Sequence, residues 1–192
     1  TLPERCDALR IHPMPSTVVI FGGDTDPGYR LAELACAAKW RVVSVLRSRI
    51  TVPFLKRIGA ETVYAEATER AEVDAVFQAR DASDLAVVCL VGGSPQLNTQ
   101  GNLNVIEAAA AAGVKRFVLT TSIGCGDSAG AIDPFVKAIA GRSIRAKEWA
   151  ENRLRSTSMD WTIVRAGGTT RRVGTGGAIL VDSTTVSGHI NL

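Results

Sequence analysis

The chain of 192 residues is long enough for one domain with a substantial core, and 46% of its residues are hydrophobic while only 5% are aromatic. Its 22 basic and 19 acidic residues leave a net charge of +3, and no basic cluster is interleaved with aromatic residues, which argues against nucleic-acid binding. No apolar run approaches the roughly 20 residues needed to cross a bilayer.

The cysteines and histidines indicate neither a disulfide framework nor a metal site. The four cysteines lack CxxC spacing, and the two histidines are far apart, which argues against zinc. Cys36 falls in a helical pattern and Cys89 in a strand pattern, so both are predicted to be reduced core residues in a reducing compartment. Cys125, close to Asp127, is predicted to be unreactive.

The chain is predicted to consist of an irregular N-terminal arm, residues 1–16, and one domain, residues 17–192. The arm contains Pro3, Pro13 and Pro15. Because the sequence begins at Thr1, a trimmed organelle-targeted precursor is one interpretation of this arm.

Strand and helix patterns alternate along the domain. Short apolar, mostly β-branched runs predict strands at residues 18–21, 42–46, 62–65, 85–90, 116–121 and 161–165, with an edge strand at 178–181. Helical spacing predicts helices from Asp26 to near Trp40 and at 54–58, 69–79, 98–112 and 143–156. Thr68 is the expected N-cap of the helix at 69–79, and Trp149 is expected to be a core or half-buried packing residue. The alternation predicts an α/β doubly wound parallel sheet in the order 3-2-1-4-5-6.

Four stretches carry a family resemblance: VVIFGGDTDPG, RVVSVLRS, NTQGNLNVIEAAAAAGVKRFVLTTSIGCGDS and AKEWAENRLRSTSMDWTIVRAGG. In this order and spacing the chain resembles atypical short-chain dehydrogenase/reductases of the NmrA-like and biliverdin-reductase-B-like kind, over residues 17–190. The resemblance implies a Rossmann-like domain that binds NADP(H). Family members commonly continue past the position of Leu192 with a helix and a strand. Two interpretations stay open: the site is open and shallow because this part is absent, or the sequence is a truncated piece of a longer protein.

The glycine loop departs from the family pattern, which has glycine at positions 22, 25 and 28. The resemblance places the cofactor's pyrophosphate against Gly22, Gly23, Thr25, Asp26, Pro27 and Gly28. Gly22 makes the tight turn and Gly28 allows helix and strand to pack closely. Position 25, however, carries a Cβ that restricts positive φ and crowds the phosphate.

Two interpretations of the acidic residues in this loop stay open. Asp26 is a preferred N-cap residue and Pro27 a preferred first helical residue, so Asp26 could accept the N–H groups that a phosphate would use. In this hypothesis the protein partly fills its own phosphate site, and NADP(H) binding is weak or absent. Alternatively, Asp24 and Asp26 both point to solvent and Arg30 pairs with Asp26.

Further cofactor contacts follow from the resemblance. Arg47 ends the second strand, where an arginine suits the 2′-phosphate of NADP(H), with Arg49 assisting. The remaining predicted contacts are Glu66 beside adenine, Val91 and Gly92 along the ribose, and Ala166 and Gly167 beside nicotinamide.

The predicted catalytic residues are Ser122 and Lys147. Ser122 follows the fifth strand and would bind a substrate carbonyl, with Thr121 as its rival; a polar strand cap is the alternative. The Tyr-x-x-x-Lys pair of full dehydrogenases corresponds to Ser143 and Lys147, so the usual phenolic acid is replaced by a weaker one. Lys147 would hold the nicotinamide ribose or pair with Glu151 on the helix surface.

Two functions are consistent with these residues. The first is an NADPH-dependent oxidoreductase acting on a small conjugated acceptor of the quinone or flavin type, bound near Ser122 and the loop after Gly167. The second is a non-catalytic scaffold, assembly factor or complex subunit with weakened cofactor binding. The expected partners are a small molecule or a protein, with no metal and no nucleic acid. The expected compartment is the cytoplasm or an organelle stroma, a plastid included.

Overall fold

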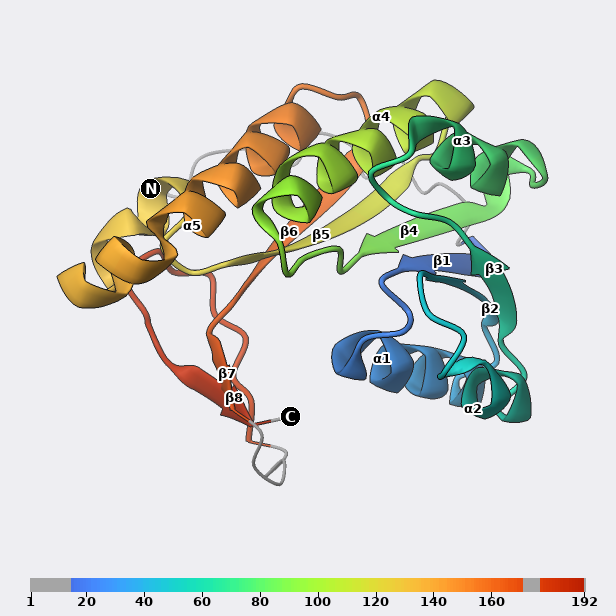
Figure 1. The fold of residues 1–192 in the computed structure, drawn as a ribbon, viewed down its shortest axis with the longest axis horizontal. Helices are drawn as coiled ribbons and strands as arrows, with labels where there is room; N and C mark the ends of the chain where they lie inside the picture. The colour runs from blue at the N-terminus through green and yellow to red at the C-terminus, as the bar shows by residue number, and fades with distance from the viewer. Residues whose placement is uncertain (1–14, 171–176, 192) are drawn as a thin grey trace, which may run out of the picture.

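A computed structural model describes residues 15–170 and 177–191, so the predicted arm lies outside the described residues except for Pro15 and Ser16. Six parallel strands form one sheet in the order β3-β2-β1-β4-β5-β6, with helices on both faces (Figure 1). This confirms the predicted doubly wound α/β fold and its strand order. The order in which successive strands are added reverses between β1 and β4, the point where such folds bind ligands beyond the carboxyl ends of the strands.

The strands are short and mostly aliphatic. Every residue of β1 is buried, because β2 and β4 flank it and helices cover both of its faces. The strand bounds are β1 (Thr17–Phe21), β2 (Arg41–Leu46), β3 (Glu61–Tyr64), β4 (Leu85–Cys89), β5 (Arg116–Ser122) and β6 (Asp160–Ala166).

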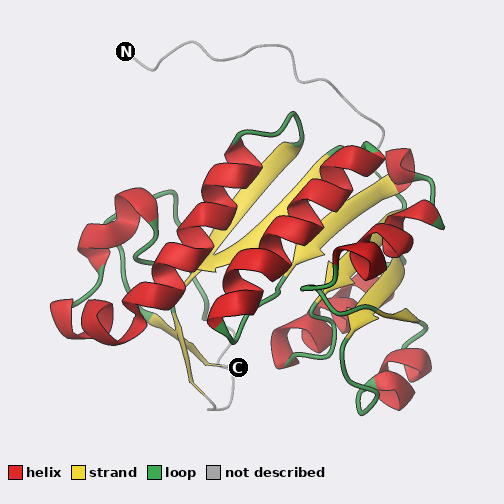
Figure 2. Ribbon diagram, turned by 45° about the horizontal axis from the view of Figure 1, so that its top comes forward, coloured by secondary structure: helices red, strands yellow, loops and turns green. Residues whose placement is uncertain are grey.

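The helices divide between the two faces of the sheet. On one face lie α3 (Arg70–Gln78), α4 (Asn102–Ala112) and α5 (Pro134–Arg155), of which α4 and α5 run side by side (Figures 1 and 2). On the other face lie α1 (Asp26–Ala37) and α2 (Val52–Arg57). Short 3-10 helices occur at η1 (Ala82–Asp84) and η3 (Gly126–Ala131), and a π-helical segment, η2 (Leu97–Gly101), leads directly into α4.

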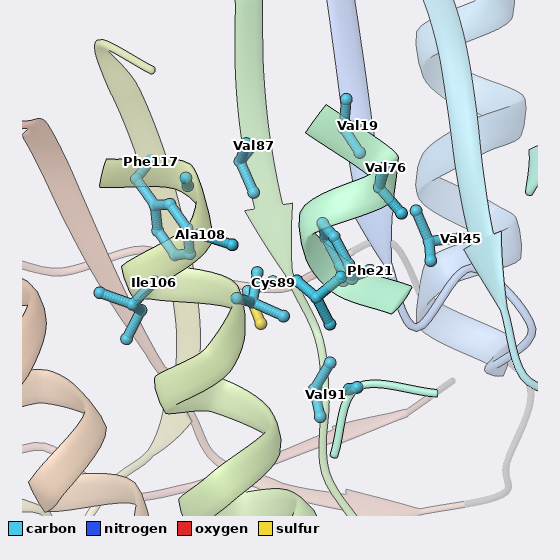
Figure 3. Packing of buried hydrophobic residues seen from close by; sticks show 14 of the residues in the cluster. Val19, Phe21, Val45, Val76, Val87, Cys89, Val91, Ile106, Ala108 and Phe117 are labelled. Atoms are coloured by element: carbon cyan, nitrogen blue, oxygen red, sulfur yellow. The ribbon is translucent and has the colours of Figure 1, made fainter. Parts of the chain in front are cut away.

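The two faces of the sheet have separate hydrophobic cores. Val19 and Phe21 of β1 point into the larger core under α3 and α4, where the rings of Phe21 and Phe77 lie 5.8 Å apart (Figure 3). Val18 and Ile20 point into the smaller core under α1 and α2. This alternation follows from the two-residue period of a strand.

Several predicted boundaries were wrong. The last helix begins at Pro134 instead of residue 143, because Asp133 caps it by accepting the N–H of Phe135 at 2.8 Å. Thr68 does not cap α3, since its hydroxyl donates to Glu66 and the helix starts after Glu69. Trp149 is 64% exposed instead of packed on the core.

The predicted edge strand at residues 178–181 was also wrong. These residues are exposed and have no regular structure. The chain instead forms a separate two-stranded parallel sheet from β7 (Gly168–Thr170) and β8 (His189–Asn191), which projects from the main body in Figure 1. The strand near the end of the chain is therefore β8, which pairs with β7 directly after β6 and does not add to the main sheet.

One part of the main sheet has no helix over it within the described residues. Opposite α4 and α5, strands β4, β5 and β6 line an apolar groove of about 830 Å³ together with Leu31, Ala35 and Trp40. Val88 and Val118, which point to this side, are half-buried. None of the helices in the described ranges combines the length and apolarity that a membrane span requires.

Candidate functional site

Two glycines shape the turn between β1 and α1. Gly22 has a φ of +85°, and a Cβ there would lie 3.0 Å from the carbonyl oxygen of Leu90. A Cβ on Gly28 would lie 2.1 Å from the carbonyl oxygen of Gly22, closer than any real contact. Both positions therefore require glycine, for the tight turn and for the close approach of helix to strand, as the sequence predicted.

Thr25, not Asp26, caps the first helix. Its hydroxyl accepts the N–H of Gly28 at 3.1 Å and donates to the carbonyl of Gly22 at 2.7 Å. Its φ of −87° is extended, so the missing family glycine causes no backbone strain. Asp26 is the exposed first residue of the helix, and Arg30 pairs with Glu33. The predicted Asp26 cap is wrong because the Thr25 hydroxyl accepts the Gly28 N–H instead. The alternative Arg30–Asp26 pair is wrong because Arg30 pairs with Glu33.

Asp24 bonds to the loop that follows β2. Its Oδ2 accepts the backbone N–H of Ser48 at 3.0 Å and that of Arg47 at 3.3 Å. Its Oδ1 is buried and has no hydrogen-bond partner among the described residues. The expectation that Asp24 points to solvent is therefore wrong. Sequence analysis missed this role, since it depends on β1 and β2 ending side by side.

Five of the predicted cofactor residues line one pocket at the carboxyl ends of β1, β2 and β4: Gly22, Thr25, Arg47, Val91 and Gly92. Asp24 lines it as well. Its enclosed part measures about 20 Å³, room for about one water molecule, so a nucleotide would lie along its mouth.

Other predicted adenosine contacts differ in their placement. The Glu66 carboxylate accepts hydrogen bonds from Thr68, while its neighbours Ala65 and Ala67 line the pocket. Glu66 itself does not line this pocket. The Arg49 guanidinium lies 4.9 Å from the centre of the Tyr64 ring, which holds it at the edge of the sheet. Gly23 is buried against Ser44, and Pro27 is exposed.

A second polar group forms between η2 and α5. The side-chain amide of Asn98 donates to the Ser143 hydroxyl at 2.7 Å. Asn98 is 1% exposed, and its Oδ1 has no partner within the described part of the chain. A Cβ on Gly92 would lie 3.3 Å from that oxygen, which places Asn98 beside the pocket. The sequence marked Asn98 only as the start of the predicted helix at 98–112 and did not indicate its place beside the pocket.

Lys147 follows Ser143 by one turn of α5. It is half-buried and forms no hydrogen bond or ion pair with any described residue. Burial lowers the pKa of its ammonium below the ordinary value of 10.5, although the nearby Cys125 acts in the opposite direction. The predicted Lys147–Glu151 pair is wrong, because Glu151 has other partners.

Glu151 is fully buried and anchors the ends of β5 and β6 to α5. It accepts hydrogen bonds from Arg165 at 3.0 and 2.7 Å, from Arg155 at 3.1 Å and from the Thr121 hydroxyl at 2.7 Å. Burial would raise the pKa of Glu151, but the hydrogen bonds and positive charges of its partners outweigh it and lower the pKa. Arg165 also pairs with Asp127.

These contacts distinguish the two candidate hydroxyls at the end of β5, Thr121 and Ser122. Thr121 is buried, and its hydroxyl donates to Glu151. The structure therefore does not bring Thr121 to the cofactor pocket, contrary to the prediction. Ser122 is half-buried, and its hydroxyl donates to the neighbouring carbonyl of Ile123 at 3.1 Å. Cys125 is buried, and burial raises the pKa of its thiol, which fits the predicted lack of reactivity.

Ala166 and Gly167 line a separate pocket of about 560 Å³ beside β6. Ile123, Val164 and Leu180 contribute apolar surface, and Arg155, Asp127 and Arg165 contribute charge. Among the described residues, no group of three His, Cys, Asp or Glu side chains gathers so as to hold a metal ion.

Comparisons with known proteins agree with this geometry. A family model described as NAD(P)H-binding matches residues 22–191. A comparison with curated proteins found no match.

Among solved structures, ChuY, an anaerobilin reductase from Escherichia coli O157:H7, is 30% identical. The match covers 91% of this chain and 84% of ChuY with a TM-score of 0.81. ChuY from E. coli strain CFT073 is also 30% identical, over 92% of this chain and 84% of its own, with a TM-score of 0.77. A putative NAD-dependent epimerase/dehydratase from Bacillus halodurans is 25% identical, over 84% and 74%, with a TM-score of 0.70.

Proposed function

We propose that this protein, which belongs to the NAD(P)H-binding family, is a reductase that uses a nicotinamide dinucleotide to reduce a conjugated acceptor. The observation that carries this proposal is Lys147, a half-buried and unpaired lysine with a lowered pKa in the described structure. Groups with such properties concentrate at functional sites. Thirty per cent identity to ChuY supports the reductase class.

The first loop fits the cofactor that the family binds. Gly22 and Gly28 allow the tight turn and the close approach of α1 to β1 that bring the start of the helix to the pocket, and the buried Asp24 Oδ1 has no hydrogen-bond donor among the described residues. Only part of the α1 N-terminus is available to a pyrophosphate, since Thr25 occupies the Gly28 N–H and Pro27 has none. We therefore expect the cofactor to bind, but more weakly than at a loop with three free amides.

Lys147 and Ser143, one turn apart on α5, suit reduction without a strong acid. When bound, the reduced nicotinamide supplies a hydride to the acceptor. The Lys147 ammonium would supply the balancing proton, and a lowered pKa makes it a better donor than an ordinary lysine. The Ser143 oxygen accepts from Asn98, which leaves its own proton free to hydrogen-bond a ligand. Lys147 and Ser143 are both weak acids. The acceptor should therefore be a conjugated molecule, which can delocalise the negative charge that hydride addition creates.

The pocket beside β6 would hold this acceptor. Its volume of about 560 Å³ lies within the range of small-molecule sites, and it is bounded by Ala166 and Gly167, the predicted neighbours of nicotinamide. Its combination of apolar side chains with Arg155 and Asp127 suits a flat molecule with polar substituents. Anaerobilin, the substrate in the name of ChuY, and small quinones or flavins are the acceptors to test first.

The test compares Lys147→Met with the exposed Lys137→Met on the same helix, assaying oxidation of NADH and NADPH with each acceptor under anaerobic conditions. We expect Lys147→Met to lower kcat by about 100-fold or more, the usual contribution of a positioned acid, with little change in cofactor Kd. Lys137→Met should behave as the parent. Activity of the parent should fall with rising pH at a pH below 10.5, because the protonated lysine is required. A Lys147→Met variant with the parent's kcat would contradict the role of Lys147.

A second candidate function is a non-catalytic scaffold or assembly factor. The observation that favours it is the Thr25 cap, which uses an amide that a bound pyrophosphate would otherwise need. Titration with NADH and NADPH to millimolar concentration distinguishes the two functions. Saturable binding supports the reductase, whereas no binding of either nucleotide leaves the scaffold.

A further inference from the structure

Asp24 joins the two loops that frame the adenosine half of the pocket. It follows Gly22 in the first loop, and its Oδ2 accepts the N–H groups of Arg47 and Ser48 at the end of β2, at 3.3 and 3.0 Å. Its other oxygen, Oδ1, is buried and lacks a hydrogen-bond partner in the described structure. Asp24 and Arg47 line the same pocket. A carboxylate is therefore fixed in place with one acceptor oxygen unused.

The end of the second strand is where parallel nucleotide-binding sheets read the 2′ position of the adenosine ribose. An acidic residue there accepts a hydrogen bond from the 2′-hydroxyl of NAD(H), whereas an arginine accommodates the 2′-phosphate of NADP(H). This chain has both types of residue at that place. Its carboxylate comes from the loop after β1 and reaches across to β2, so the pattern of the second strand alone does not reveal it.

An ionised carboxylate only accepts hydrogen bonds. It can therefore take the proton of a ribose hydroxyl but cannot donate to a phosphate oxygen. Oδ2 also occupies two backbone N–H groups that could otherwise bind a phosphate. A phosphate beside Asp24 would meet both a like charge and a shortage of donors.

Arg47 acts in the opposite direction, but with less constraint. Its side chain is exposed and forms no hydrogen bond or ion pair with any described residue. Solvent therefore screens its charge, and the side chain is free to change rotamer. The Asp24 carboxylate is held by two backbone amides and partly shielded from water. Fixed, poorly solvated charges interact more strongly than mobile, exposed ones, so we expect Asp24 to dominate.

We propose that Asp24 determines the cofactor preference of this protein, selecting NAD(H) over NADP(H) despite Arg47. This inference rests on the proposed use of a nicotinamide dinucleotide. It names which form of the cofactor the site takes and which residue excludes the other form.

The experiment measures Kd for NADH and NADPH by calorimetry or fluorescence, with ADP and 2′,5′-ADP as probes of the adenosine half alone. The parent should bind NADH and ADP at least tenfold more tightly than their 2′-phosphorylated counterparts. Asp24→Asn keeps one acceptor for the amides of Arg47 and Ser48 and replaces the other oxygen by a donor. It should shift the ratio of Kd values toward the phosphorylated ligand at least tenfold. If Asp24→Asn fails to fold, Asp24→Thr replaces it. Its hydroxyl can donate to phosphate, so it should shift the ratio of Kd values in the same direction.

The matched control is Asp26→Asn, which removes the same charge from the same loop. Asp26 is exposed and contacts neither Arg47 nor Ser48 by hydrogen bond, so its change should affect both nucleotides alike and leave their ratio unchanged. A parent that prefers NADPH, or an unchanged ratio in both Asp24 variants, would overturn the inference while leaving the reductase proposal standing. Failure of all four nucleotides to bind would overturn both.

Discussion

Glu151 shows how a single buried charge connects the fold to the site. The side chain is 0% exposed, and its partners come from β5, β6 and α5. Removing a charge from water is costly, and here several charge-assisted hydrogen bonds compensate for it. The same contacts place Arg165 at the base of the predicted nicotinamide segment, Ala166 and Gly167. Glu151 is thus a structural support at the carboxyl edge, not a partner of Lys147.

We predict that Glu151→Gln lowers the free energy of unfolding by roughly 1–3 kcal/mol at neutral pH, the cost of losing buried charge-assisted hydrogen bonds. Because the folded state lowers the pKa of Glu151 below its ordinary 4.5, the charged form stabilises the fold above that pH. This stabilisation is lost as the pH falls through the lowered pKa. The difference between parent and variant should therefore be largest near pH 6 and shrink below about pH 4.

Urea denaturation across pH 3–7 measures this difference. Glu33→Gln is the control, because it breaks an exposed pair with Arg30 that contributes at most about 1 kcal/mol. A Glu151→Gln variant whose deficit stays constant down to pH 3 would contradict the assigned ionisation.

Among the secondary-structure elements, α1 is the one whose position the binding loop most depends on. Only Gly28 and Ala32 are buried in this helix, so small residues set its distance from the sheet. The Thr25 cap and the proline in its first turn start the helix directly after the glycine turn. A larger residue at the contact would push the helix N-terminus away from Gly22.

We predict that Gly28→Ala destabilises the fold by several kcal/mol, because the added Cβ would lie 2.1 Å from the Gly22 carbonyl oxygen and force the backbone apart. Gly141→Ala in α5 is the matched variant, since a Cβ there meets nothing within 4 Å. It should stabilise the protein by up to about 1 kcal/mol through helix propensity alone. Thermal unfolding of both variants checks the contrast, and equal effects would refute the packing argument.

At the scale of the whole molecule, the core is unevenly distributed. Helices α3, α4 and α5 cover one face of the sheet, whereas α1 and α2 cover only the β1–β3 side of the other within the described ranges (Figure 1). The remaining strands expose an apolar groove on that face. Successive residues of β5 therefore face a packed core and an open groove in turn.

This asymmetry predicts that truncating neighbouring residues of β5 lowers the free energy of unfolding by different amounts. Leu119→Ala should cost about 2–5 kcal/mol, because Leu119 is fully buried in the larger core. Val118→Ala should cost less than about 1 kcal/mol, because Val118 is half-buried and borders the groove. Chemical denaturation of the two variants measures the difference. Similar losses would mean that the groove face is as tightly packed as the core.

The regular elements were largely predictable because their signals are local. Short apolar runs identified all six strands of the main sheet, and alternation with helices indicated their order. The start of α5 was missed because its first turns, with Phe135 and Ile139, are exposed and lack an apolar stripe facing the core. The edge strand at 178–181 was wrong because an apolar run alone does not specify a pairing partner.

The sequence by itself determined the α/β class, the glycine turn and which residues follow each strand, because periodicity and turn chemistry act between near neighbours. Only the tertiary structure decided what the charged side chains bind, since their partners lie on other strands. Asp24 accepts the amides after β2, and Glu151 pairs with Arg165, which leaves Lys147 without a partner among the described residues. A carboxylate's partner depends on which segments the sheet brings within about 3 Å, and that proximity is a property of the assembled fold.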